Sequence, residues 1–300
     1  MSLLVVGSTA FDTVETPHGI ARDCLGGSST YFALAARLFT DVRLVSVVGD
    51  DFPPASRQLL ESRGIDLTGV EVKPGKTFRW HGRYSADMNS RSTIDVQLNT
   101  FGDFKPKVPA ASKDTPFVFL ANGSPGTQIS VLEQMQKPKF CVADTMDLWI
   151  ERERDGLLKL LQRIDGIIVN DAEARMLTGR NNLIDAGRAI LDLGPRLAIV
   201  KKGEHGSFFV GEHSLFLSNT YPVREIVDPT GAGDAYAGGV LGYLARQPKL
   251  NEREIARAMG WGSVVGSFYV EGFGPDGLKT KTMRDLNARY NSFVKLCSIP

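Results

Sequence analysis

Short, almost continuous hydrophobic runs recur along the chain and alternate with segments that have a helical pattern. A run without polar alternation is typical of a strand buried on both faces of a mostly parallel sheet. The helical segments between these runs predict an α/β fold with helices on both faces of that sheet. The predicted strands are 2–7, 42–49, 117–121, 139–144, 166–170 and 197–201. The predicted helices are 28–39, 53–63, 127–136, 148–162, 172–178, 184–193 and 279–296.

Residues 70–104 break this pattern, because polar and apolar residues alternate there, as in TFRWHGRY and STIDVQL. Alternation predicts strands with one wet face, here two or three antiparallel strands that stand off the main body. Residues 10–20 could add one more strand. A sheet this small buries little by itself, so it must close over a ligand cleft or a partner subunit. We therefore expect a single domain, 1–300, with lid strands from about 10–20 and 70–104.

Composition narrows the class of protein. The 300 residues are 42% hydrophobic, and the formal net charge is +1. This balance leaves no broad basic field for nucleic acid or for an anionic membrane surface. The three cysteines have no CxxC spacing, which argues against a disulfide framework or a zinc site. With no signal-peptide pattern and no membrane-length apolar run, we expect a cytoplasmic protein.

Three glycine loops compete as phosphate binders. Residues 69–77, GVEVKPGKT, resemble a P-loop but have one residue too many between the glycines, and a strand pattern follows them. A turn is the better interpretation of this loop. The second loop, GGSS at 26–29, opens a helix. It is either a capped helix start or a place where paired glycines let a ligand approach the backbone.

The third loop, GAGD, places Gly231, Ala232 and Gly233 directly before the acid Asp234. It lacks the last glycine of a dinucleotide fingerprint, because Tyr236 stands there. Small residues at a helix start expose their amides to an anion. Asp234 is either an ordinary helix-start acid or a base for an alcohol that attacks a phosphoryl group held by those amides.

Six ordered motifs together resemble the ribokinase-like (PfkB) carbohydrate kinases. The most specific is VDPTGAGDAYAGG, which is similar to the C-terminal signature of that family. The resemblance implies a three-layer α/β/α fold with a small β-sheet lid, ATP and Mg²⁺ as cofactors, and a sugar or nucleoside as substrate. The other motifs are GSTAFD, LGGSSTYFALAARL, VVGDDFP, VNDAEARMLTG and VKKGEHGSFFV.

The resemblance also assigns roles to individual residues. Asp234 would be the catalytic base, and the amides of Gly231, Ala232 and Gly233 would form the anion hole. The substrate would contact Asp12, Gly26, Gly27 and Ser28. Asn170 and Glu173 would organise Mg²⁺ through water near the ATP phosphates, with Lys202 and Gly203 on the nucleotide strand. Asp228 and Thr230 match positions that help to hold a monovalent cation, such as K⁺, in some members.

This chain departs from the ribokinase pattern on the substrate side. Ala10 replaces an Asn, and Ser28 and Tyr31 replace a Lys and an Asn of the double-glycine loop. Because hydroxyl-binding sites discriminate through such polar groups, ribose is a poor candidate substrate. GGSS is similar to the loop of adenosine kinases, which keeps a nucleoside kinase open as the alternative to a sugar kinase. A non-catalytic sugar-binding protein and a homodimer formed through the lid also stay open.

Overall fold

The computed structural model describes residues 1–298, which form a nine-stranded main sheet and a four-stranded lid sheet. The order of the main sheet is β13-β12-β11-β10-β9-β8-β1-β4-β5. Its strands run parallel from β5 to β11, and β12 and β13 are antiparallel. Their bounds are β1 Leu3–Val6, β4 Val42–Gly49, β5 Ile65–Lys73, β8 Phe117–Leu120, β9 Phe140–Ala143, β10 Gly166–Asn170, β11 Leu197–Lys201, β12 Ser207–Gly211 and β13 Leu215–Ser218.

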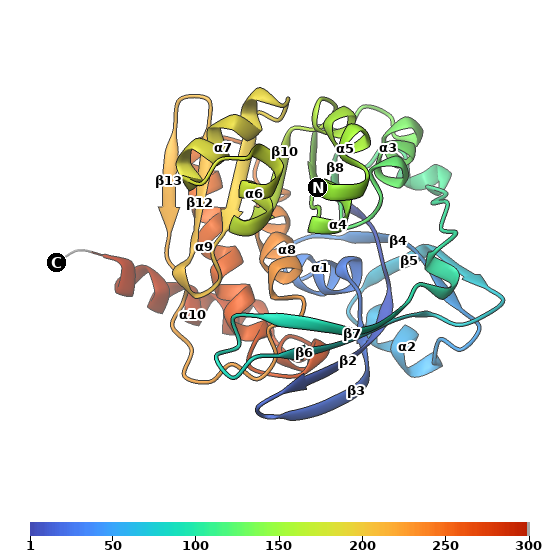
Figure 1. Ribbon diagram of the computed structural model, residues 1–300. Helices are drawn as coiled ribbons and strands as arrows, with labels where there is room; N and C mark the ends of the chain where they lie inside the picture. Colours follow the sequence, from blue (N-terminus) through green and yellow to red (C-terminus); the bar gives the residue numbers. More distant parts are fainter. Residues whose placement is uncertain (299–300) are drawn as a thin grey trace.

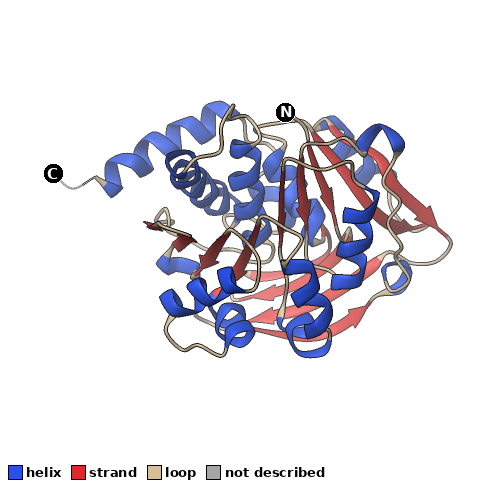
Figure 2. Cartoon of the chain, turned by 90° about the horizontal axis from the view of Figure 1, so that it is seen from above, coloured by secondary structure: helices blue, strands red, loops and turns tan. Residues whose placement is uncertain are grey.

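Helices cover both faces of the main sheet, as Figures 1 and 2 show. One core cluster joins strand residues such as Leu3 and Phe119 to one helix layer, and a second joins their neighbours Leu4 and Val118 to the other. The three predicted layers are therefore confirmed. The first layer contains α1 Ser28–Ala36, α2 Pro54–Ser62, α8 Ala232–Leu244 and α9 Glu252–Tyr269, against which α10 Met283–Cys297 packs. The second contains α3 Pro125–Gln134, α4 Asp147–Arg152, α5 Arg154–Leu161, α6 Asp171–Thr178 and α7 Leu183–Asp192.

The lid sheet lies beside the main body, below it in Figure 1. Its order is β3-β2-β6-β7, with β2 Ala10–Thr16, β3 Gly19–Gly26, β6 Phe78–Tyr84 and β7 Arg91–Gln97. The pairs β2–β3 and β6–β7 are antiparallel, as expected, whereas β2 and β6 pair in parallel. The chain therefore passes from the main sheet into the lid twice, from β1 to β2 and from β5 to β6.

The structure corrects two boundaries. Residues 70–73 belong to β5 of the main sheet, not to the lid. They share the alternating pattern because β5 is an edge strand with one exposed face. The predicted helix 148–162 is two helices, α4 and α5, separated at Glu153, whose φ and ψ of −126° and 36° are not helical. No helix within residues 1–298 is long and apolar enough to cross a membrane.

Candidate active site

The GAGD residues, 231–234, lead into α8, and we call residues 231–233 the anion loop. The geometry of this loop depends on glycine. Gly231 has a φ of 78°, in the left-handed region, and a Cβ at this position would overlap the ring of Tyr31 from α1. Ala232 begins the helix, so Asp234 lies in its first turn. Further along α8, a Cβ on Gly239 would lie 3.0 Å from the Cα of Gly262 in α9. The helix glycines therefore allow close helix packing.

Asp234 lies in the first turn of α8 and is partly exposed. Burial in the site raises the pKa of its carboxyl group well above the usual value, and the nearby negative charge of Asp144 raises it further. The ammonium group of Lys201 opposes both effects. A carboxylate with a raised pKa is a stronger base at neutral pH, which suits the role expected of Asp234.

Asp144 and Lys201 form a buried ion pair that the sequence analysis did not place in the site. Asp144 follows β9 and Lys201 ends β11, and the Oδ2 and Nζ atoms are 3.6 Å apart. Burial alone would lower the pKa of Lys201, but the carboxylates of Asp144, Glu173 and Asp234 outweigh it and raise that pKa. Lys201 Nζ lies only 3.0 Å from where a Cβ of Gly233 would be. Lys201 therefore sits directly beside the anion loop.

The signal for this pair was present in the sequence. Both residues stand at the carboxyl end of a hydrophobic strand run, the edge at which open α/β sheets bind ligands. Lys202, the lysine expected on the nucleotide strand, lies in the loop after β11. Gly203, also expected there, does line the nucleotide-side cavity described below.

Asn170 and Glu173 form the N-terminal capping box of α6. The Oδ1 atom of Asn170 accepts a hydrogen bond of 2.8 Å from the backbone N–H of Glu173, and Glu173 Oε2 accepts one of 2.8 Å from the backbone N–H of Asn170. Burial, followed by the negative charge of Asp144, raises the pKa of Glu173 to about 7. Glu173 is thus a partly buried helix cap with acidic neighbours. Only its Oε2 atom takes part in the capping box, so Oε1 is free to bind another group.

The expected substrate side is centred on Asp12, a buried residue of β2. Burial raises the pKa of Asp12 to about 7, although the hydroxyl of Tyr31, which donates to its carboxylate, counteracts the effect. A Cβ on Gly26 would overlap this carboxylate, and one on Gly27, whose φ is 96°, would overlap the carbonyl of Ser8. The paired glycines therefore let the loop lie directly against Asp12.

Ser28 begins α1 in the same loop. Its hydroxyl oxygen lies 3.1 Å from the hydroxyl oxygen of Ser8, and its backbone N–H donates to that same Ser8 oxygen. The structure thus places Ser28 next to the glycine pair, joined to the end of β1.

Asp228 and Thr230 hold the start of the anion loop. Asp228 is fully buried and accepts hydrogen bonds from the backbone N–H groups of Thr230, at 2.8 Å, and Gly274, at 3.1 Å. Burial also raises the pKa of Asp228. The hydroxyl of Thr230 lies 3.2 Å from that of Tyr84, which belongs to the lid strand β6. The lid therefore touches the loop itself.

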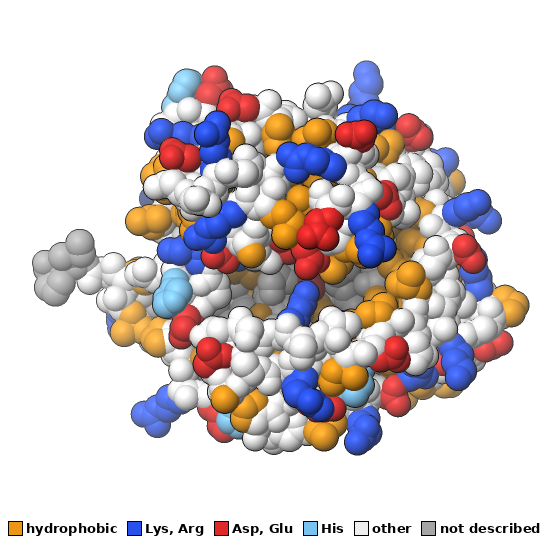
Figure 3. All heavy atoms as spheres, viewed as in Figure 1, with side chains coloured by type: hydrophobic (Ala, Val, Ile, Leu, Met, Phe, Trp, Pro, Cys, Tyr) orange, Lys and Arg blue, Asp and Glu red, His pale blue; other side chains and the backbone are white. Residues whose placement is uncertain are grey.

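A cavity of about 440 Å³ opens next to the anion loop on the side of β11 and β12. Figure 3 shows the hollow between the lid and the main body, with acidic side chains on its upper rim. The cavity walls combine the start of α8 with a more apolar recess. Its lining includes Lys201, Gly203, Ala232, Gly233, Tyr236 and the lid residue Asn89.

Comparison with known proteins identifies the family. The model of the pfkB family of carbohydrate kinases matches residues 3–282. A cytidine kinase from Thermococcus kodakarensis is 30% identical over 258 residues, 84% of this chain and 91% of the relative. A nucleoside kinase from Methanothermobacter thermautotrophicus is 28% identical over 286 residues, 90% of this chain and 89% of the relative.

A solved structure has the same fold. The Burkholderia thailandensis nucleoside kinase in complex with inosine superimposes with a TM-score of 0.81 at 19% identity, covering 98% of this chain and 99% of that one. The expectation of a ribokinase-like α/β fold with a lid is thereby confirmed. The chain belongs to the pfkB family of carbohydrate kinases and is a phosphotransferase with an alcohol group as acceptor.

Proposed function

We propose that the chain transfers the γ-phosphoryl group of ATP to a hydroxyl of a nucleoside, with Asp234 as general base. The observation that carries this proposal is the position of Asp234, in the first turn of α8 directly after the glycine loop and beside Lys201. A base, amides at a helix start and a cation at one point are what transfer to an alcohol needs. Of these amides, the N–H of Ala232 donates to the carbonyl of Pro229 at 3.1 Å in this structure, so a phosphoryl group would have to share or replace that bond.

In the proposed reaction, Asp234 accepts the proton of the acceptor hydroxyl while that oxygen bonds to the γ-phosphorus. The bond from this phosphorus to the bridging oxygen breaks, and ADP leaves with the electron pair. The amides of Gly231, Ala232 and Gly233 and the ammonium of Lys201 stabilise the charge on the phosphoryl oxygens. Asp12, with the loop of Gly26, Gly27 and Ser28, accepts hydrogen bonds from the other acceptor hydroxyls.

A nucleoside is the acceptor that the observations favour. A second cavity, of about 100 Å³, lies at the carboxyl ends of β1 and β8, and aromatic and aliphatic side chains dominate its walls. Such walls suit the flat faces of a base. The similarity to the cytidine and nucleoside kinases supports the same choice. These walls are formed by Leu98, Phe101, Phe104, Val131 and Trp149, among others.

A sugar or sugar-like alcohol is the second candidate acceptor. The buried carboxylate of Asp12 favours it, because a carboxylate can accept hydrogen bonds from vicinal hydroxyls of a free sugar as well as of a ribose.

ATP would occupy the 440 Å³ cavity, with Gly203 and the neighbouring Lys202 on the strand β11 side. Mg²⁺ would be organised through water by Asn170 and Glu173. The donor set fits, because Mg²⁺ prefers oxygen ligands and keeps several waters, and Glu173 retains an oxygen outside the capping box. When bound, the ion neutralises phosphate charge.

A monovalent cation such as K⁺ beside Asp228 and Thr230 would stabilise the anion loop. Replacing K⁺ by a large organic cation should then lower the turnover rate.

We also propose that two copies associate through the lid. The edge strand β7 is exposed along its whole length and carries the exposed apolar side chains Ile94 and Val96. An unprotected edge strand of this kind pairs readily with a second copy. Light scattering should give twice the monomer mass, and Val96→Lys should reduce it to the monomer mass.

The test of the acceptor is a release assay for ADP with a panel of nucleosides and sugars. We expect turnover with at least one nucleoside and none with Asp234→Asn at the same protein concentration. Turnover with sugars alone would overturn the nucleoside assignment, and full turnover by Asp234→Asn would overturn the base.

A further inference from the structure

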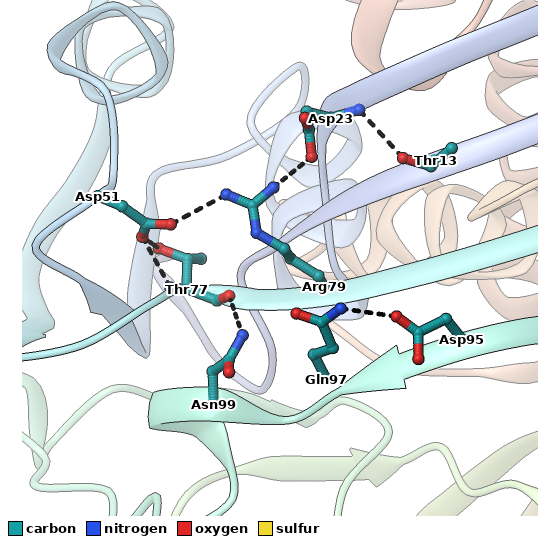
Figure 4. A network of polar contacts seen from close by, with 8 residues as sticks. All are labelled: Thr13, Asp23, Asp51, Thr77, Arg79, Asp95, Gln97 and Asn99. Carbon is teal, nitrogen blue, oxygen red and sulfur yellow. Dashed lines mark hydrogen bonds and ion pairs between the residues drawn. The ribbon is translucent and has the colours of Figure 1, made fainter.

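The lid strands carry four arginines, and two of them, Arg79 and Arg83, are already paired with carboxylates. The other two are Arg22, exposed on the outer strand β3, and Arg91. Arg79 of β6 contacts Asp51 of the main body, with Nη2 and Oδ2 3.0 Å apart, and also Asp23 of β3, as Figure 4 shows. Arg83 donates to Glu15 of β2 at 2.6 Å. Arg91, the first residue of β7, makes no ion pair with any carboxylate of residues 1–298. Its guanidinium carbon lies 5.7 Å from the centroid of the Trp80 ring, so Arg91 rests on an aromatic face of the lid and its positive charge is not neutralised by a carboxylate.

The pairing of the lid strands places Arg91 over the catalytic loop. Arg91 is the cross-strand partner of Tyr84, so the two side chains leave the same face of the lid. The hydroxyl of Tyr84 lies 3.2 Å from that of Thr230, immediately before Gly231. At the tip of the same hairpin, Asn89 donates to Glu204 at 3.2 Å across the nucleotide cavity. Contacts of Tyr84 and Asn89 with the main body therefore hold the β6–β7 hairpin close to Arg91.

Arg91 faces the acidic groups on both sides of the reaction. Burial raises the pKa values of Asp12, Glu173 and Asp234, and the positive charge of Arg91 is among the nearby charges that lower them again. Asp12 lies on the proposed acceptor side, Glu173 lies on the proposed nucleotide side, and Asp234 is the proposed base between them. A cation that acts on all of them lies near the path of the transferred group.

The charges around the site favour such a cation. Lys201 is already paired with Asp144, and Asp12, Glu173 and Asp234 add further carboxylates. A triphosphate brings more negative charge to this point. A guanidinium group can donate two parallel hydrogen bonds to phosphoryl oxygens, whose charge is spread over three equatorial atoms in the transition state.

We propose that Arg91 is a catalytic residue that binds the oxygens of the transferred phosphoryl group while the lid covers both substrates. The inference rests on the proposed use of ATP but not on the identity of the acceptor. It distinguishes Arg91 from Arg79, which ties the lid to the main body, and from Arg83, which lies in an outer ion pair.

The experiment compares Arg91→Met and Arg91→Lys with the control Arg83→Met, an exposed lid arginine of the same size. We expect Arg91→Met to lower kcat by about 10² or more, the effect of losing one charge-stabilising donor. Arg91→Lys should recover part of it, and Arg83→Met should keep the wild-type kcat. Wild-type turnover by Arg91→Met would overturn the proposal.

Calorimetry separates this inference from the acceptor assignment. Arg91→Met should weaken the binding of a non-hydrolysable Mg²⁺–ATP analogue but leave the affinity for Mg²⁺–ADP unchanged, because only the former has a γ-phosphoryl group. Equal loss for both nucleotides, or no loss, would contradict the proposed contact. This measurement needs no acceptor, so it stands even if the chain phosphorylates no nucleoside. Thermal unfolding of each variant shows whether it is folded.

Discussion

The ammonium group of Lys201 lies 3.6 Å from the carboxylate of Asp144, and both side chains are largely buried at the end of the anion loop. Removing one partner of a buried ion pair leaves the other without compensation, which typically costs about 3–5 kcal/mol of stability. We therefore expect Lys201→Met to lower both stability and turnover, measured by urea unfolding and ADP release. The double variant with Asp144→Asn should regain much of the stability but not the turnover. Recovery of both would show that Lys201 has only a structural role.

The pH dependence of turnover should report the raised pKa of Asp234. The base works only when deprotonated, so kcat should fall as pH decreases through that pKa. Because the pKa lies above the usual carboxyl range, the fall should begin at a higher pH than for an ordinary aspartate. Asp234→Asn should lower kcat by at least ~10² with little change in ATP affinity. An unchanged kcat, or a rate that rises toward acid, would contradict the role of Asp234.

The stability of the free protein should decrease between acid and neutral pH because of Asp12 and Glu173. Both have pKa values of about 7 in the folded protein, against ordinary values of 3.8 and 4.5. Their contribution is fully present below the unfolded-state values and is lost as pH rises through 7, because the folded state binds the protons more tightly.

Asp12→Asn and Glu173→Gln should each flatten this dependence in urea unfolding from pH 4 to 8. Asp285→Asn is the matched control, since the pKa of the exposed Asp285 is lowered and its substitution leaves these buried acids unchanged. A slope that persists in the double variant of Asp12 and Glu173 would assign the effect to other groups.

Two glycines of the anion loop should respond differently to alanine. Gly231→Ala introduces a side chain at a φ of 78° and against the ring of Tyr31, so we expect a loss of about 1–3 kcal/mol in unfolding free energy. Gly233→Ala meets only the flexible end of Lys201, so stability should change little while kcat falls. Equal effects on stability would mean that backbone strain does not distinguish the two positions.

The layers of the fold were predictable because the parallel strands are buried on both faces and read as unbroken apolar runs. Residues 70–73 of the edge strand β5 were expected in the lid, because their polar and apolar residues alternate as those of a lid strand do. The helix α9 was not predicted; its glycines at 260, 262 and 266 weaken a helical pattern read from propensity alone.

At the site, the resemblance to continuous family motifs pointed to Asp234 and its loop and to Asn170 and Glu173. The pair of Asp144 and Lys201 lies 57 positions apart in the chain and meets only because β9 and β11 both flank β10. Likewise, nothing in the local sequence distinguishes Arg91 from Arg79 and Arg83. Their difference depends on which carboxylates the folded lid brings near each one.

The glycines of α8 have a consequence for how the enzyme tolerates change. Where most helices meet through side chains that can adjust, α8 meets its neighbours almost backbone to backbone, as at Gly242, where a Cβ would lie 3.0 Å from the Cα of Ala36. Any bulk added there must displace the helix as a whole. Asp234 would move with the helix. A substitution two or three turns away, out of reach of either substrate, should therefore lower the turnover rate without unfolding the protein.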